Sequence, residues 1–332
     1  MKEKSTGLML IAAILVAPLL LSACSSSLPD HEAGTPSSLE MEFHRLKVEP
    51  LVHSTYPTSR RDHDSLAPQV VVITVDGMER IGWEDRPAKA SWIVRLPEQI
   101  YVNGKKLHYQ VGMEWKLEGT RWSYADSPVK DLNGLWKLDP TKGWYLDPAA
   151  EQKPVLGRQA ASIYADAMGA HYSVDVTNGS EETWSDVYTW ICLDHYHTPI
   201  TGYRPYLKVG SSWTEYQKIP DVGPGTFLPV EGREEAYSRV RPGSMAAPGV
   251  SFPGVVCWNI TDKGHLLTAH LSNDSLAVLA NQNAPCTDLF LWFGDLEPGQ
   301  QVTRRGHVLI AQASLESFEE QERALMQHLE EM

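Results

Sequence analysis

Short runs of β-branched residues, each closed by turn-forming residues, are the feature that most limits what this chain can fold into. Residues 69–75 form such a run, and Asp76-Gly77 follows it. Asn103-Gly104 matches a type I′ hairpin turn between apolar segments at 100–102 and 107–113. Residues 171–176 alternate polar and apolar side chains, as expected of a strand with one buried face. The pattern predicts an all-β protein, an antiparallel β-sandwich of the super-sandwich type.

Further strands and one helix follow from the same reasoning. We expect strands at residues 90–96, 184–197, 204–209, 212–217, 255–261, 265–271 and 301–312. Residues 113–145 are rich in Trp and turn residues without a clear period, so hairpins and long loops are expected there. A helix is predicted only over 315–331, where Ser317 and Glu320 match a capping box. Its apolar stripe at helical spacing consists of Leu315, Phe318, Leu325 and Leu329.

The N-terminus predicts the cellular compartment. Lys2 and Lys4 precede an apolar segment over residues 8–21, which leads into Ser22-Ala23-Cys24. A short apolar run that ends in small residues is typical of a secretory signal and not of a membrane-spanning helix. Residues 21–24 resemble the bacterial lipobox, which implies cleavage before Cys24, diacylglycerol on its sulfur and acylation of its amine. Because Ser25 and not Asp follows, the sorting rule of such lipoproteins implies the outer membrane. An ordinary signal peptide with an incidental Cys is the alternative.

Three segments are expected along the chain. Residues 1–23 are the signal peptide, residues 24–66 are lipidated Cys24 with a flexible tether, and residues 67–332 are the β-sandwich body with its C-terminal helix. The tether is rich in Ser, Pro and charged residues, which cannot bury enough apolar surface to offset the entropy of ordering. Its exception is residues 39–52, whose apolar side chains favour an edge strand docked on the body.

The net charge excludes nucleic acid as a partner, and the number of cysteines limits the disulfides that can form. The formal net charge is −13, and an acidic surface repels phosphate backbones, so no nucleic acid is expected. Cys192, Cys257 and Cys286 are an odd number, which allows one disulfide and one free thiol. Their apolar surroundings favour the alternative, buried small hydrophobic residues. The sequence has no zinc-type Cys/His spacing, P-loop or dinucleotide motif, so no metal or cofactor is predicted.

Part of the body, within 172–312, carries residues that match a known family. They are 176–180, Trp184, Cys192-Leu193, Arg204-Pro205-Tyr206, 279–281, Pro285-Cys286, Leu296, Pro298-Gly299, Val302 and Arg305-Gly306. In these residues the chain resembles a family of uncharacterised envelope proteins from planctomycetes and related bacteria. In this family a His follows two residues after the cysteine that Cys286 matches, and this chain has Asp288 there. A second similarity, to galactose-mutarotase-like β super-sandwiches, is one of fold alone. It implies a protein that binds or processes carbohydrate.

A pair of histidines is the first candidate for chemistry. His195 and His197 are two residues apart at the end of the expected strand 184–197, so their side chains share one face. They can act as acid or base near neutral pH, or together bind one metal ion. A hydrogen-bonded pair at a strand end is the alternative. Candidates for a third ligand are His270, Asp274 and Asp288, and Asp288 is kept as a candidate catalytic or binding residue.

Aromatic residues and one arginine suggest a sugar site. Eleven Trp and thirteen Tyr outnumber the six Phe, and an aromatic ring with a polar tip suits stacking on a sugar. The candidate stacking residues lie in loop-like segments and are Trp115, Trp122, Trp136 and Trp144. Arg204, beside Tyr203 and Tyr206, can clamp a carboxylate or sugar hydroxyls, or be a buried structural residue.

The sequence thus favours an envelope lipoprotein that binds carbohydrate through loop aromatics and Arg204. Two alternatives stay open. One is a mutarotase-like or lyase-like enzyme acting on sugars, with His195 or His197 as acid or base. The other is a structural or assembly lipoprotein that binds another protein. The expected partners are the membrane, through the lipid anchor, and a polysaccharide or oligosaccharide.

Overall fold

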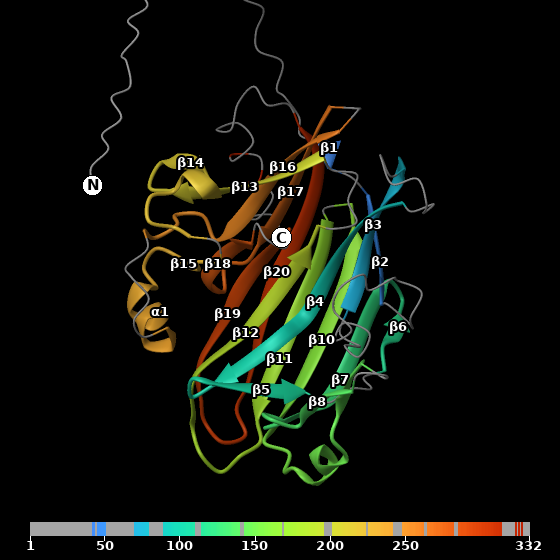
Figure 1. The fold of residues 1–332 in the computed structure, drawn as a ribbon. Helices are drawn as coiled ribbons and strands as arrows, with labels where there is room; N and C mark the ends of the chain where they lie inside the picture. The colour runs from blue at the N-terminus through green and yellow to red at the C-terminus, as the bar shows by residue number, and fades with distance from the viewer. Residues whose placement is uncertain are drawn as a thin grey trace, which may run out of the picture. The chain divides into compact units, whose positions relative to one another are not determined.

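The computed structural model describes residues 42–43, 45–50, 70–79, 89–109, 114–139, 143–167, 169–195, 201–223, 225–241, 248–261, 264–281 and 285–313, together with 323, 325 and 327. All of them belong to one compact unit, Glu40–Met332. Most are in β-strands, which form two antiparallel sheets (Figure 1). The predicted all-β sandwich is therefore confirmed. The expected signal peptide, Cys24 and most of the expected tether lie outside the described residues.

The first sheet, sheet A, has its last strand in sequence near its middle. Its strands follow in the order β6 (Lys116–Glu118), β7 (Arg121–Lys130), β10 (Gly157–Asp166), β11 (Gly169–Asn178), β20 (Gln301–Ala313), β17 (Gly264–Leu271), β16 (Gly254–Thr261), β13 (Thr201–Val209) and β14 (Ser212–Glu215). The short strand β1 (Glu42–Phe43) also pairs with the end of β20.

The second sheet, sheet B, contains the longest strand. Its order is β2 (Leu46–Pro50), β3 (Val70–Glu79), β4 (Lys89–Val102), β12 (Trp184–Asp194), β19 (Cys286–Leu296), β18 (Ser275–Asn281) and β15 (Leu228–Pro229). Strand β5 (Lys105–Tyr109) pairs with β4 of sheet B and with β7 of sheet A, so it joins the two sheets. Strands β8 (Trp136–Asp139) and β9 (Gly143–Leu146) form a separate ribbon.

The core lies between the inner faces of the two sheets. Val174 of β11 and Ile191 and Leu193 of β12 are fully buried in one cluster that draws on nearly every long strand. Strands that cover one face in this way alternate inward and outward side chains. A shift of one residue in the pairing register would turn every apolar side chain outward. A second cluster lies on the outer face of sheet A, where Leu267 and Leu309 contact buried Leu325.

Hydrogen bonds between buried polar side chains cross the core. On sheet A, the His270 ring lies 2.9 Å from the hydroxyl of Tyr172 through Nε2. Its Nδ1 lies 3.1 Å from the carbonyl oxygen of Thr287 on sheet B, and the Thr287 hydroxyl in turn lies 3.4 Å from His195 Nε2. A carbonyl only accepts, so His270 donates from Nδ1, and Nε2 of the neutral ring accepts from Tyr172. This chain of hydrogen bonds needs no charge in the core.

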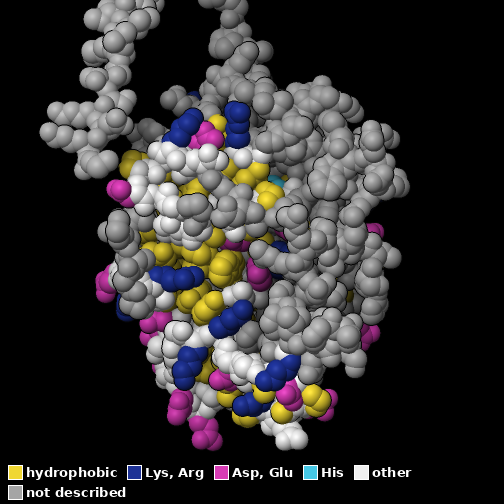
Figure 2. All heavy atoms as spheres, viewed as in Figure 1, with side chains coloured by type: hydrophobic (Ala, Val, Ile, Leu, Met, Phe, Trp, Pro, Cys, Tyr) yellow, Lys and Arg dark blue, Asp and Glu magenta, His cyan; other side chains and the backbone are white. Residues whose placement is uncertain are grey.

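The described residues contain little helix. Residues 323, 325 and 327 are helical, in agreement with the helix predicted over 315–331. Helix α1 (Glu234–Val240) and the short 3-10 helices η2 (Pro148–Gln152) and η3 (Tyr216–Lys218) were not predicted. In Figure 1, α1 lies on the outer side of sheet B, and Figure 2 shows hydrophobic side chains gathered on that face. No helix in the described part of the chain is both long enough and apolar enough to span a membrane.

Local predictions are largely confirmed, with differences at strand ends. The hairpin turn at Asn103-Gly104 joins β4 to β5, and β2 is the expected edge strand, with Lys47 and Glu49 exposed. The strands expected at 90–96 and 100–102 are one strand, β4, which passes Pro97 where its pairing with β12 shifts register. Proline is tolerated at such irregularities because it has no N–H to pair. The stretch 113–145 contains β6, β7, β8 and β9.

The close approach of Gly306 to Tyr172 yields a stability prediction. These residues are partners in the pairing of β11 with β20, and a Cβ at position 306 would lie 2.2 Å from the Tyr172 hydroxyl oxygen. We expect Gly306→Ala to lower the free energy of unfolding by about 1–3 kcal/mol, because Tyr172 must move. Chemical denaturation measures this. The control Gly223→Ala, whose nearest neighbour is Thr226 Oγ1 at 3.8 Å, should change stability by no more than about 0.5 kcal/mol. An equal loss in both variants would contradict the steric explanation.

Candidate functional site

A groove on the outer face of sheet A is lined by residues of neighbouring strands. Strand pairing places Arg121, Tyr164, His171 and His307 side by side across β7, β10, β11 and β20. Side chains alternate along a strand, so these residues face away from the core, which their neighbours line. The cavity has a volume of about 400 Å³ and is also lined by Ser162, Asp166, Tyr172, Ser173, Thr303 and Arg305. Its walls are thus polar side chains on paired strands.

Three side chains of the groove form a hydrogen-bonded chain. Asp166 Oδ1 lies 2.9 Å from Nε2 of His171, whose Nδ1 lies 2.9 Å from Nδ1 of His307. The carboxylate accepts, so His171 donates from Nε2; when both rings are neutral, Nδ1 of His171 accepts the Nδ1 proton of His307. Nε2 of His307 then carries a lone pair. His171 is buried, whereas His307 is only partly buried. The arrangement therefore places a histidine base at the groove and supports it with a carboxylate.

Arg121 and Tyr164 form one wall of the groove. The guanidinium of Arg121 lies 4.5 Å from the centre of the Tyr164 ring, and its Nη1 donates to the Ser162 hydroxyl at 3.2 Å. The Ser162 and Ser173 hydroxyls are 2.9 Å apart. Cation–π stacking and these hydrogen bonds hold the side chains in one orientation. The groove therefore presents hydroxyl, guanidinium, imidazole and carboxylate groups within a small volume.

The structure places His195 away from this groove. Its side chain is 4% exposed, faces the core and packs against Tyr203, with 5.3 Å between the ring centres. Burial lowers the pKa of His195 to about 3, and it does the same to His270. Both rings are therefore neutral at pH 7 and inaccessible to a substrate. His197, the second predicted histidine, lies outside the described residues.

The other candidate residues also lie apart from the groove. Arg204 is exposed on β13, so the structural alternative of a buried arginine does not apply. Asp288 is 2% exposed on β19, and burial raises its pKa to about 7. The Asp274 carboxylate lies 3.7 Å from Arg304 and accepts from the Arg305 backbone N–H. Cys192, Cys257 and Cys286 are free and buried, as the apolar surroundings predict.

The Trp residues selected from the sequence lie in strands or against the core. Trp115 is partly buried, and its ring meets Tyr124 edge-on at 4.8 Å between centres. Trp122 lies within β7 and also packs partly buried against the core. Trp136 and Trp144 belong to the β8–β9 ribbon, in residues whose side chains are not described. Neither Trp115 nor Trp122 lines the groove.

The groove residues were missed, although one signal for them exists in the sequence. Thr303, Arg305 and His307 alternate along β20, and His171, Ser173 and Asp175 alternate along β11. Such alternation identifies a polar strand face, but not which strands are neighbours. The groove combines residues between 121 and 307, and only the order of strands in the sheet shows that they are neighbours.

Comparison with known proteins gives little further information. No family model and no curated protein matches the sequence, and the expected planctomycete family is not shown. Among solved structures, the chain is similar to a protein described as a kojibiose phosphorylase from the human microbiome. The TM-score is 0.38 with 10% sequence identity, and the alignment covers 88% of this chain but 36% of that chain. A similarity at this level shows nothing about the activity of this protein.

The buried histidines predict a loss of stability in acid. Because the folded pKa of His270 lies below its unfolded value of about 6.5, its contribution is complete above that pH and decreases as the pH falls toward 3. Each such histidine removes about 1.4 kcal/mol per pH unit across this range. We expect His270→Gln to lower the slope of unfolding free energy against pH by about that amount between pH 6 and 4. Urea unfolding with a chelator present measures it.

The control for this experiment is Arg204→Gln, which changes an exposed residue of the same sheet. Its slope should equal that of the unmodified protein. If His270→Gln also left the slope unchanged, a neutral, buried His270 would be contradicted.

Proposed function

We propose that this protein is a lipid-anchored envelope protein that binds a carbohydrate in the groove on sheet A. The groove supports this function because its volume of about 400 Å³ falls within the range of small-molecule sites, about 300–1,000 Å³. Its side chains stand on paired strands, which hold a binding site more rigidly than loops do. This replaces the predicted loop aromatics and Arg204 with residues of β7, β10, β11 and β20.

The chemistry of the groove suits a ligand with many hydroxyl groups. Ser162 and Ser173 can each donate or accept, Asp166 accepts, and Arg121 only donates. A sugar ring offers hydroxyls that act in both ways, so it can pair with all of these groups at once. An apolar ligand would displace water from these groups without replacing its hydrogen bonds, at a cost of about 1–3 kcal/mol for each group left unsatisfied.

The positive charges of the groove favour an acidic sugar. Arg121 and Arg305 both line it, whereas the protein as a whole carries a formal charge of −13. The carboxylates of Asp166 and Asp175 lie nearby, but among the described residues neither forms an ion pair with these arginines. Asp166 hydrogen-bonds to His171, and Asp175 accepts from the Thr303 hydroxyl. A guanidinium binds a carboxylate or sulfate through two parallel hydrogen bonds. The preferred ligand is therefore a uronic acid or a sulfated sugar.

Acid–base catalysis on the bound sugar is the second candidate function. The observation that favours it is the chain from Asp166 through His171 to His307, which orients the His307 imidazole at the groove. A positioned base of this kind contributes about 10²–10⁴-fold to a proton transfer. In this form of the enzyme hypothesis, His307 takes the role that the sequence suggested for His195 or His197.

Binding to the groove is tested with Arg305→Ala. Because a hydrogen bond to a charged group contributes about 1.5–3 kcal/mol, we expect the dissociation constant for an acidic oligosaccharide to rise at least about tenfold. Calorimetry with uronate, sulfated and neutral oligosaccharides measures it. Arg204→Ala is the matched control, since it removes an exposed arginine of sheet A outside the groove, and it should bind normally. Loss of binding in Arg204→Ala alone would overturn the groove and favour the sequence-based site.

Catalysis is distinguished from binding with His307→Ala. If the protein is an enzyme, this variant should retain the oligosaccharide within about tenfold of the original affinity but lose turnover by at least about 100-fold. Nuclear magnetic resonance of the sugar during incubation detects anomer exchange, elimination or cleavage. Binding without any change in the sugar would leave the non-catalytic function.

The lipid anchor is tested at Cys24. Cys24→Ser removes the sulfur to which diacylglycerol would be attached, so we expect the protein to move from the detergent phase to the aqueous phase on phase separation. Mass spectrometry of the N-terminal peptide of the unmodified protein should find a triacylated Cys24. A soluble protein with an unmodified cysteine would contradict the anchor.

A further inference from the structure

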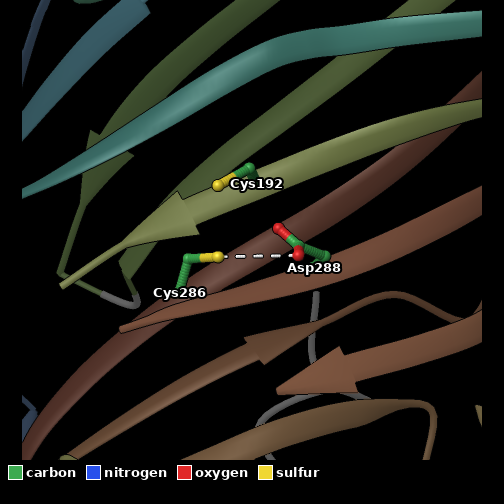
Figure 3. A group of neighbouring side chains, drawn as sticks. All are labelled: Cys192, Cys286 and Asp288. Carbon is green, nitrogen blue, oxygen red and sulfur yellow. Dashed lines mark hydrogen bonds between the residues drawn. The ribbon is translucent and has the colours of Figure 1, made fainter. Parts of the chain in front are cut away.

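Two cysteines and an aspartate meet on the outer face of sheet B, whereas the groove lies on sheet A. In the pairing of β12 with β19, Cys192 is the partner of Asp288, and Asp194 is the partner of Cys286. Residues two apart on a strand share a face, so Cys192, Cys286 and Asp288 point the same way (Figure 3). The two sulfur atoms and one carboxylate oxygen all lie within 4.8 Å of one another.

The three residues are buried and poorly satisfied. Their exposed fractions are 3% for Cys192, 7% for Cys286 and 2% for Asp288. Cys286 Sγ donates to Asp288 Oδ2 at 3.5 Å, and the Cys192 sulfur lies beside both groups, but a thiol is a weak donor. Asp288 Oδ1 has no partner at hydrogen-bonding geometry in the described part of the chain, although the Trp190 indole lies beside this carboxylate. A buried carboxylate with so few partners destabilises the fold unless something else binds it.

Arg95 lies beside the trio of Cys192, Cys286 and Asp288 but does not neutralise its charge. Its Nη2 lies 3.7 Å from Asp194 Oδ2, so one acidic partner already balances its charge. Its Nη1 donates to Cys192 Sγ at 3.1 Å. Donors of this kind often bind the sulfur of a metal-bound thiolate from outside the coordination sphere and tune the site. Two thiolates and one carboxylate would still carry three negative charges, which suits a divalent cation.

We propose that Cys192, Cys286 and Asp288 bind one zinc ion, with Arg95 hydrogen-bonded to the Cys192 sulfur. Zinc accepts both thiolate and carboxylate ligands, whereas calcium and magnesium require oxygen ligands and copper(I) favours sulfur alone. Donor atoms around tetrahedral zinc lie about 3.5–3.8 Å apart, given bonds of about 2.0–2.3 Å, so small rotations close the present spacing. Three protein ligands leave a fourth position for water. Residues of two neighbouring strands supply the site, so the ion would pin β12 to β19.

Metal binding is tested on the full chain, stripped with a chelator and kept reduced. Cobalt(II) serves as the probe, because thiolate ligands give it a charge-transfer absorption that zinc lacks. We expect one cobalt ion per chain, displacement of the cobalt by one equivalent of zinc, and a higher unfolding temperature with zinc. Cys192→Ser, Cys286→Ser and Asp288→Asn should each weaken binding at least about tenfold. Cys257→Ser is the matched control, since Cys257 is buried and free but outside the trio, and it should bind normally.

Measurements on the unmodified protein keep the proposal testable even if a variant fails to fold. A competition titration against a chromophoric chelator reports zinc affinity directly. Absence of thiolate-to-cobalt absorption, or zinc binding that Cys257→Ser reduces as much as Cys286→Ser does, would overturn the site. Peptide mapping that finds Cys192 and Cys286 joined as a disulfide in protein isolated from the cell envelope would overturn it as well. None of these outcomes depends on carbohydrate binding.

Discussion

Two sheets with apolar inner faces are held in one arrangement by a hydrogen-bonded chain that carries no charge. His270 connects Tyr172 on its own sheet to Thr287 on the other, and the neutral ring makes both contacts when it is protonated on Nδ1. Apolar packing alone tolerates small slides between sheets, whereas a buried donor that loses its acceptor costs about 1–3 kcal/mol. The glycine at 306 leaves the room that Tyr172 needs to reach His270. The alignment of the sandwich thus depends on a few polar atoms.

The outer faces of the two sheets have different chemistry. On sheet A, an alternation of polar residues in β10, β11 and β20 exposes charged and hydroxyl groups to solvent. On sheet B, α1 and the segment around Phe227 cover β12 and β19, so the polar side chains there are buried among aromatic rings. Exposed polar groups suit reversible contact with a soluble ligand. Buried ones suit a group that stays bound, because exchange would require the cover to open.

Strand positions were predictable where local chemistry determines them, as at Asn103-Gly104 and in the alternation of β11. Strand β18 was not, because every residue but its last is buried, so the sequence shows no alternation. The site was not predictable for a different reason. Polar residues at the end of a strand predicted a site at His195, but in the fold that side chain points into the core. The groove depends on the order of strands in sheet A, which no local pattern contains.

The position of β20 determines when the molecule becomes complete. This strand is the last of the sandwich in sequence, yet it lies between β11 and β17, and it carries Arg305 and His307. During synthesis, before β20 is present, sheet A is therefore divided into two groups of strands. One group ends at β11 and the other at β17, and among the described residues no backbone pairing within sheet A connects them. Pairing between segments distant in sequence is slow, because the chain between them must first be closed into a loop. A growing chain consequently has neither a finished core nor a ligand site, and the ability to bind arises in a single step, when the final strand is inserted.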